Sequence, residues 1–173
     1  MVRQDQATLC VSLSEVQAYA RVETGEEEAL LAGLLRTASE WCETFLNQAL
    51  VARDFELDLR SGESWTMLPL QPVRSINSVR RKGDADPLAA SAYRSDIDFD
   101  GRGHIAGLPA GDTFVVSGSA GMGLTGNEIP EPIRQGILRL AAYLFANRDS
   151  LVGELPKAVT ALWRPYRKTG LCR

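Results

Sequence analysis

The stretch EEEALLAGLLRTASEWCETFLNQ, residues 26–48, gives the strongest secondary-structure signal in this chain. Its apolar side chains recur every three or four residues, which places them in one wide stripe along an α-helix. Glutamates at its first three positions suit the positive end of a helix dipole. The stretch therefore predicts a long amphipathic helix that buries its stripe against another element. The stripe consists of Leu30, Leu31, Leu34, Leu35, Ala38, Trp41, Cys42, Phe45 and Leu46.

A second helical pattern covers residues 131–148 and follows prolines that the start of a helix tolerates. We expect this helix to pack against residues 26–48, because neither helix can bury its stripe alone. Gly136 lies within it, where alanine would be a better helix former. The apolar positions of this pattern are Ile133, Ile137, Leu140, Ala141, Leu144 and Phe145.

Shorter helices are expected near both ends of the chain. Ser12 and Glu15 have the spacing of a capping box, which predicts a short helix that ends near Arg21. A last short helix begins at Pro156, and Pro165 limits its length.

Between these helices the apolar period changes to two. Phe55, Leu57 and Leu59 alternate with charged residues, as in a strand with one solvated face. The run from Thr113 to Ser117 is rich in β-branched residues and predicts another strand. The middle of the chain is therefore expected to be β-rich.

Together these patterns predict an α+β fold in a single domain of residues 1–173. Residues 12–50 and 130–168 would form a helical bundle core, with two long amphipathic helices and short N- and C-terminal helices. Residues 51–119 would form a small antiparallel β region inserted between them. Residues 156–173 would be a partner-docking segment.

The composition is that of an ordinary soluble globular protein, with 45% hydrophobic and 24% charged residues among 173. The net charge of −3 argues against a dedicated nucleic-acid binder. We see no signal peptide and no apolar run of roughly 20 residues, and therefore expect no membrane partner. Cys10, Cys42 and Cys172 lie far apart, so neither a disulfide framework nor a zinc site is predicted.

One acidic turn has the pattern of a metal site. Asp96, Asp98 and Asp100, followed by Gly101, copy the first half of a calcium-binding EF-hand loop. The second half of the segment does not match such a loop, because its twelfth position is Gly107 where an EF-hand has glutamate. We interpret the segment as a solvated acidic turn. A small soluble metal-binding protein or enzyme that uses this turn is the alternative function.

Other patterns give little support for catalysis. Gly118 to Gly123 is rich in glycine, but no Gly-Lys-Ser/Thr follows it, as a phosphate-binding loop requires. His104 is the only histidine, and no nucleophile motif accompanies it. We therefore predict no catalytic residue, no metal site and no cofactor.

Charge is distributed unevenly along the chain. Residues 1–50 carry eight acidic and three basic side chains, whereas residues 157–173 carry five basic and no acidic ones. One interpretation is helix-dipole complementarity and solvation. The other is that the basic C-terminal segment contacts a second subunit or another partner, because its aromatic and arginine side chains are typical of interface anchors. One face of Trp163 could equally lie in the core. The candidate contact residues are Trp163, Arg164, Tyr166, Arg167 and Lys168.

Val73, Ile76 and Val79 predict a further strand, and a second basic cluster, Arg80, Arg81 and Lys82, lies at its end. Such a cluster usually keeps a sheet edge soluble, and it could also form an interface. A DNA-binding regulatory module built on it is a third hypothesis, which the net charge disfavours.

Several segments, in this order and at these intervals, resemble the head-tail connector, or adaptor, proteins of long-tailed phages, prophages and gene transfer agents. The resemblance covers nearly the whole chain. The segments are LSEVQAYARV (13–22), EEEALL (26–31), MLPLQPVRSI (67–76), YRSDIDFDGRGHI (93–105), VVSGSAGMG (115–123), IPEPIRQGILRLAAYLFANR (129–148) and LWRPYR (162–167).

This resemblance implies a structural protein without enzymatic activity. Such a protein is made in the host bacterial cytoplasm and ends in the neck of the virion, between capsid and tail. Copies form a closed ring, generally of about twelve, from one repeated interface. DNA passes through the lumen without specific binding, because many phosphate contacts would resist its movement.

The resemblance also implies protein partners on both sides of the ring. The C-terminal segment, residues 156–173, would bind the portal protein, with Trp163, Arg164, Tyr166, Arg167 and Lys168 as its contacts. The β region would face a tail-side connector or stopper protein or a neighbouring subunit, and residues 80–82 are the candidate contacts there.

Overall fold

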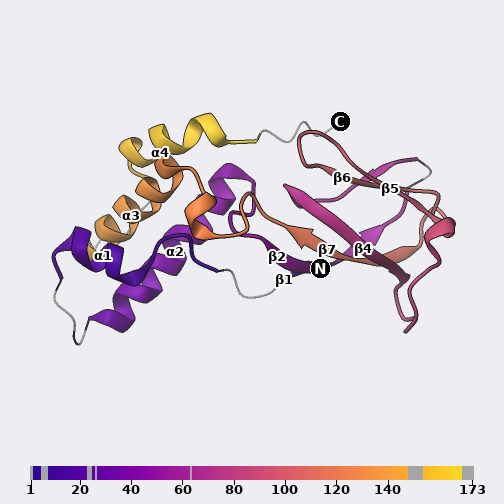
Figure 1. Cartoon of the computed structure of the whole chain (residues 1–173), viewed down its shortest axis with the longest axis horizontal. Helices are drawn as coiled ribbons and strands as arrows, with labels where there is room; N and C mark the ends of the chain where they lie inside the picture. Colours follow the sequence, from indigo (N-terminus) through magenta and orange to yellow (C-terminus); the bar gives the residue numbers. More distant parts are fainter. Residues whose placement is uncertain are drawn as a thin grey trace. The chain divides into compact units, whose positions relative to one another are not determined.

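The computed structural model describes residues 2–4, 8–22, 25, 27–62, 64–147 and 154–168. The chain divides into two compact units (Figure 1). A β unit comprises Met1–Thr8 and Val51–Leu124, and a helical unit comprises Leu9–Leu50 and Thr125–Arg173. Among the described residues, no helix has the length and apolar character that a membrane crossing requires.

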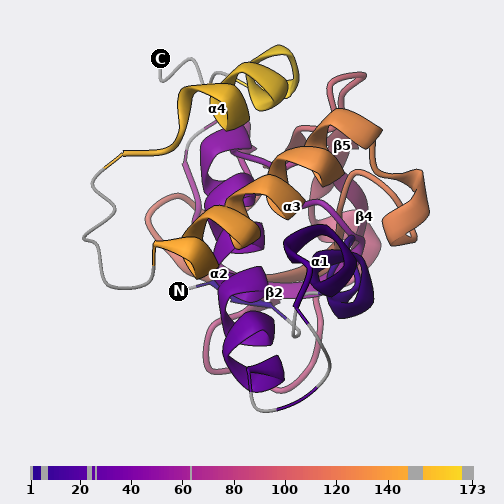
Figure 2. The same cartoon turned by 90° about the vertical axis from the view of Figure 1, so that its left-hand side faces the viewer.

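The helical unit is built around α3 (Glu131–Ala146), which contacts α1 (Leu13–Ala20), α2 (Glu28–Leu46) and α4 (Lys157–Trp163) (Figure 2). A capping box fixes the start of α1: the Ser12 amide donates to Glu15 Oε2 at 2.7 Å, and the Glu15 amide donates to Ser12 Oγ at 3.2 Å. The α-helices are α1 (Leu13–Ala20), α2 (Glu28–Leu46), α3 (Glu131–Ala146) and α4 (Lys157–Trp163), with short 3₁₀ turns η2 (Gly126–Glu128) and η3 (Arg164–Tyr166).

The core of this unit contains the inner part of the predicted stripe. Leu30 is 41% exposed, because the buried face of α2 is narrower than the apolar stripe. Full burial of one large aliphatic side chain contributes about 1.5–3 kcal/mol, so these contacts dominate the stability of the unit. The buried helical side chains are Val16, Leu31, Leu35, Ala38, Cys42, Leu46, Ile133, Ile137, Leu138, Leu140, Ala141, Leu144, Val159 and Trp163.

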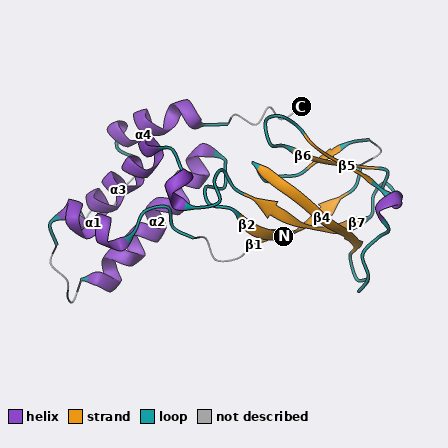
Figure 3. Cartoon of the chain, viewed as in Figure 1, coloured by secondary structure: helices purple, strands orange, loops and turns teal. Residues whose placement is uncertain are grey.

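The β unit contains two antiparallel sheets (Figure 3). The four-stranded sheet has the order β1-β2-β7-β4, and the three-stranded sheet has the order β3-β6-β5. Its short helical element is the 3₁₀ turn η1 (Ala90–Ala92). The strands are β1 (Val2–Gln4), β2 (Arg53–Arg60), β3 (Thr66–Met67), β4 (Val73–Arg81), β5 (Arg94–Ile97), β6 (Gly103–Ala106) and β7 (Thr113–Ala120).

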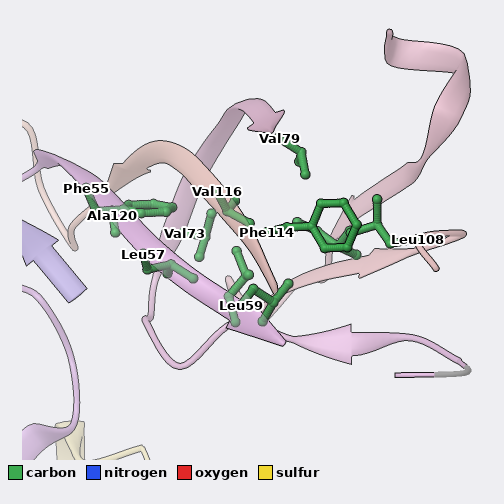
Figure 4. Close-up of a cluster of buried hydrophobic side chains, with 11 residues drawn as sticks. Phe55, Leu57, Leu59, Val73, Val79, Leu108, Phe114, Val116 and Ala120 are labelled. Carbon is green, nitrogen blue, oxygen red and sulfur yellow. The ribbon is translucent and has the colours of Figure 1, made fainter. Parts of the chain in front are cut away.

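Alternation along β2 and β7 gives the four-stranded sheet one apolar face. Leu57 lies opposite Val116, and both are buried in a cluster that Figure 4 shows. Phe55 lies opposite Gly118, where a Cβ atom would come within 2.1 Å of the Ser75 carbonyl oxygen. Only glycine fits there. The buried cluster comprises Phe55, Leu57, Leu59, Leu68, Val73, Val79, Ile105, Leu108, Phe114, Val116 and Ala120.

The predicted fold class is wrong, because the chain is not a helical bundle core with a small β insertion. The strands form two sheets with their own buried cluster, and the larger sheet also includes β1 from the N-terminal end. The helices form only one of the two units. The sheets depend on pairs that are distant in sequence, such as β2 with β7, which local periodicity does not reveal.

Some predicted segments lie outside the described residues. They are the expected helix ends at Glu26 and Arg148, and residues 169–173 of the predicted docking segment.

Candidate protein-interaction surfaces

Trp163 lies in the core of the helical unit, where its side chain has no exposed surface. Its Nε1 donates to the Ile133 carbonyl oxygen at 3.1 Å, and its ring centroid is 5.8 Å from that of Phe45. The indole lies on Gly136, where a Cβ atom would come within 2.0 Å of Nε1. In this fold Trp163 therefore anchors α4 to α3, and its side chain is not a surface group.

The other candidate residues of the C-terminal segment follow directly after this anchor. Arg164 and Arg167 are exposed, and the Arg167 guanidinium carbon lies 5.2 Å from the Phe45 ring centroid. The Lys168 amide donates to the Leu46 carbonyl oxygen at 3.0 Å. Gln48 Nε2 donates to the Tyr166 carbonyl oxygen at 2.5 Å. The backbone is thus fixed against the end of α2, while two arginines face solvent.

The basic cluster at the end of β4 is paired with acids of the same unit. Arg80 contacts Glu56 at 2.5 Å, and Lys82 contacts Asp58 at 2.8 Å. The hydrogen bond from Lys82 lowers the pKa of Asp58. These charges are therefore largely neutralised within the sheet, which does not favour a DNA-binding surface. The third pair joins Arg81 and Asp112, 3.1 Å apart.

In the acidic turn between β5 and β6, the Asp98 carboxylate accepts hydrogen bonds from backbone amides of the same turn. Asp98 Oδ1 accepts from the amides of Asp100 and Arg102, each at 2.9 Å. Its Oδ2 lies 3.6 Å from His104 Nε2. The amide of Arg102, then that of Asp100, then His104 lower the pKa of Asp98, although desolvation opposes them. No group of three or more acidic, cysteine or histidine side chains in the described part of the chain could hold a metal ion.

Cys10 and Cys42 are buried and form no disulfide. Burial raises the pKa of the Cys10 thiol to about 11 and also raises that of Cys42. Since the thiolate is the reactive form, neither side chain is suited to nucleophilic catalysis. Cys172 lies outside the described residues.

A surface that the sequence analysis did not identify lies on the three-stranded sheet. Phe99, at the turn between β5 and β6, is 99% exposed. Trp65 and Met67 on the β3 side are about half exposed, and the Arg94 guanidinium carbon lies 5.6 Å from the Trp65 ring centroid. A phenylalanine between two aspartates of a tight turn was the signal that could have revealed it.

The fold of the whole chain can be compared with known proteins. No family model matches the sequence, and no curated protein matches it. A chain in the neck of an empty gene transfer agent (GTA) particle computed with C6 symmetry has a TM-score of 0.78 and 26% identity. The match covers 99% of this chain and 97% of that chain.

Two further solved structures give the same result. A chain in the virion of a native gene transfer agent particle has a TM-score of 0.76 and 26% identity. A chain in the neck of a native particle computed with C12 symmetry has a TM-score of 0.73 and 25% identity. Both matches again cover 99% of this chain and 97% of the other. This chain is therefore similar, over nearly its whole length, to chains of gene transfer agent particles, and two of the three structures are particle necks.

Proposed function

We propose that this chain is a structural protein of a virion neck, in a phage, a prophage particle or a gene transfer agent. Copies of it would form a ring that joins the capsid portal to the tail. The observation that carries this proposal is the match to a neck chain with a TM-score of 0.78 over 97% of that chain. Symmetry of C6 and C12 in the two neck structures supports a ring of rotationally related copies.

The C-terminal segment, residues 156–173, would bind the portal. In its described part, residues 156–168, Arg164 and Arg167 are exposed, and Tyr166 and Lys168 lie beside them with partly exposed surfaces. Trp163 would contribute by fixing the position of this segment, since its side chain is buried in the helical unit. A basic surface with one tyrosine, on a backbone fixed by hydrogen bonds, is pre-organised for an acidic partner.

DNA would pass through the ring without specific binding. The net charge of −3 gives the chain little attraction for phosphates. Arg80, Arg81 and Lys82 each have an acidic partner in their own unit, which reduces their attraction for phosphates further.

The β unit would face a tail-side connector or stopper protein or a neighbouring copy. The cluster of Arg80, Arg81 and Lys82 is the predicted contact there. Contact through these residues would exchange their present ion pairs for pairs with the partner, at little net cost because the side chains are exposed or half-exposed.

The portal of the same particle, co-expressed with the full chain, tests the docking surface. Arg164→Glu with Arg167→Glu should abolish co-purification with the portal, whereas Arg60→Glu, an exposed arginine of the β unit, should leave it intact. Cryo-electron microscopy of the particle tests the location. Equal portal binding by both variants would refute the docking surface, and absence of the chain from the neck would refute the function.

A further inference from the structure

The turn between β5 and β6 presents one apolar side chain fully to solvent. Phe99 is 99% exposed, whereas large apolar side chains of a soluble protein are mostly buried. The turn around it is ordered by its own hydrogen bonds. The Gly101 amide donates to the Asp98 carbonyl oxygen at 2.9 Å, and the Asp98 amide donates to the Arg102 carbonyl oxygen at 3.0 Å. The phenyl ring is thus held outward on a pre-organised turn, as an interface anchor is.

The charges around Phe99 determine what it can bind. Three aspartates, Asp96, Asp98 and Asp100, and one cation, Arg102, lie within three residues of it, a net charge of −2 that disfavours DNA phosphates and anionic lipid surfaces. The Asp96 side chain is exposed and has no hydrogen bond or ion pair with any described residue. The tip therefore fits a protein surface that combines an apolar contact with a free cation.

Such a surface exists on the outer side of α3. The Arg139 side chain is exposed and has no hydrogen bond or ion pair with any described residue. Tyr143 follows one helical turn later and is 41% exposed, so both side chains lie on one face of the helix. Ala146 is exposed on the same face and leaves room for an incoming ring. An exposed arginine one helical turn from an aromatic side chain complements, in both charge and polarity, an exposed aspartate three residues from Phe99.

We propose that the Phe99 tip of one copy packs on Tyr143 of the neighbouring copy in the ring, and that Asp96 pairs with Arg139 of that copy. This inference rests on the ring of the proposed function. A closed ring repeats one heterologous contact, so each chain must carry two different, complementary surfaces. The turn of the β unit and the outer face of α3 are two such surfaces.

Cysteine pairing in assembled particles tests the contact directly. In a Cys172→Ser background, copies with Phe99→Cys and copies with Tyr143→Cys are co-assembled and mildly oxidised. An intermolecular disulfide between the two is expected. Tyr19→Cys is the matched control, since Tyr19 is 49% exposed on another helix of the same unit. The assignment would be overturned if Phe99→Cys cross-links to Tyr19→Cys as strongly as, or more strongly than, to Tyr143→Cys. It would also be overturned if no cross-link to Tyr143→Cys forms.

Substitutions test the energetics without a cross-link. Phe99→Ser should leave the melting temperature of the free chain unchanged, because the side chain makes almost no contact. It should weaken ring association by about tenfold or more, the effect of removing an interface anchor. Asp96→Arg or Arg139→Asp alone should weaken assembly, and the two together should restore it.

The same experiment separates this contact from the proposed function. If the natural chain forms the neck ring and the Phe99→Ser chain does so equally well, the contact is refuted while the function stands. If the variant forms rings but loses only the tail-side protein, the tip binds that protein and the copy-to-copy contact is refuted. If the natural chain is absent from the neck, both proposals fail.

Discussion

The indole of Trp163 occupies the space that a side chain at Gly136 would need. A Cβ atom at that glycine would lie 2.0 Å from the indole nitrogen and 2.7 Å from Cε2. The nitrogen also donates to the Ile133 carbonyl oxygen, one turn earlier on α3. Glycine in the middle of a helix is unfavourable in isolation, so its presence here reflects the close contact with α4.

We predict that Gly136→Ala destabilises the chain, although alanine is the better helix former. Helix propensity alone would stabilise α3 by up to about 1 kcal/mol. The clash with a fully buried ring should outweigh this gain and lower the free energy of unfolding by about 1–3 kcal/mol. Urea denaturation measures the difference.

Gly33→Ala in α2 is the matched control. The nearest atom to a Cβ there, apart from its chain neighbours and the helix backbone, is the end of the flexible Arg36 side chain at 3.9 Å. This substitution should therefore be neutral or stabilising by up to about 1 kcal/mol. Equal effects at both glycines would mean that the indole does not constrain position 136.

The buried hydrogen bond of Trp163 gives a second prediction. Trp163→Phe leaves the Ile133 carbonyl oxygen without this donor and removes part of the buried ring. The expected loss in free energy of unfolding is about 1–3 kcal/mol. Trp65→Phe, at a side chain 48% exposed, should change it far less. Thermal melts of the two variants make the comparison, and an equal loss would contradict the buried role.

The capping box of α1 should make stability depend on pH. Hydrogen bonds from the Ser12 amide and hydroxyl, and the Arg134 charge, lower the pKa of Glu15 below its ordinary value of 4.5, although desolvation opposes them. A lowered folded-state pKa means that the charged carboxylate stabilises the fold above pH 4.5. That contribution is lost as the pH falls through the lower folded-state value.

Glu15→Gln isolates this effect from the other carboxylates. At pH 7 the variant should have a free energy of unfolding lower by about 0.3–1 kcal/mol, the contribution of a negative charge near an exposed helix N-terminus, because glutamine can still complete the capping box. The gap to the natural chain should narrow steadily below pH 4.5. A gap that stays constant down to pH 2 would show that the charge of Glu15 is not what stabilises the cap.

The helices could be read from the sequence because their signals are local. The stripe from Leu31 to Leu46 and the pair of Ser12 and Glu15 specify α2 and α1 through neighbours on one helix. The sheets could not be read in the same way. Pairing of Leu57 with Val116 joins residues far apart in sequence, and each strand alone permits several partners. The β unit was therefore underestimated as a small insertion.

The candidate surfaces were only partly predictable, for a different reason. Tryptophan and arginine are enriched at interfaces, but tryptophan is also a core residue, and composition alone does not separate the two. Gly136 is the sequence feature that indicates a buried Trp163, because a glycine inside an amphipathic helix indicates a bulky side chain packed on the backbone. Phe99 was missed because an apolar residue inside an acidic turn does not contribute to any periodic pattern.

Asp98 should stabilise the β5–β6 turn as an acceptor for backbone amides instead of as a metal ligand. Asp98→Ala removes the acceptor of two hydrogen bonds, each 2.9 Å long, and should lower the free energy of unfolding by about 1 kcal/mol. Asp96→Ala is the control, because that side chain is exposed and bonds to no described residue. Melting curves with and without millimolar calcium complete the test. A rise in melting temperature with calcium that Asp98→Ala abolishes would reverse this assignment, since ligand binding to the folded chain stabilises it.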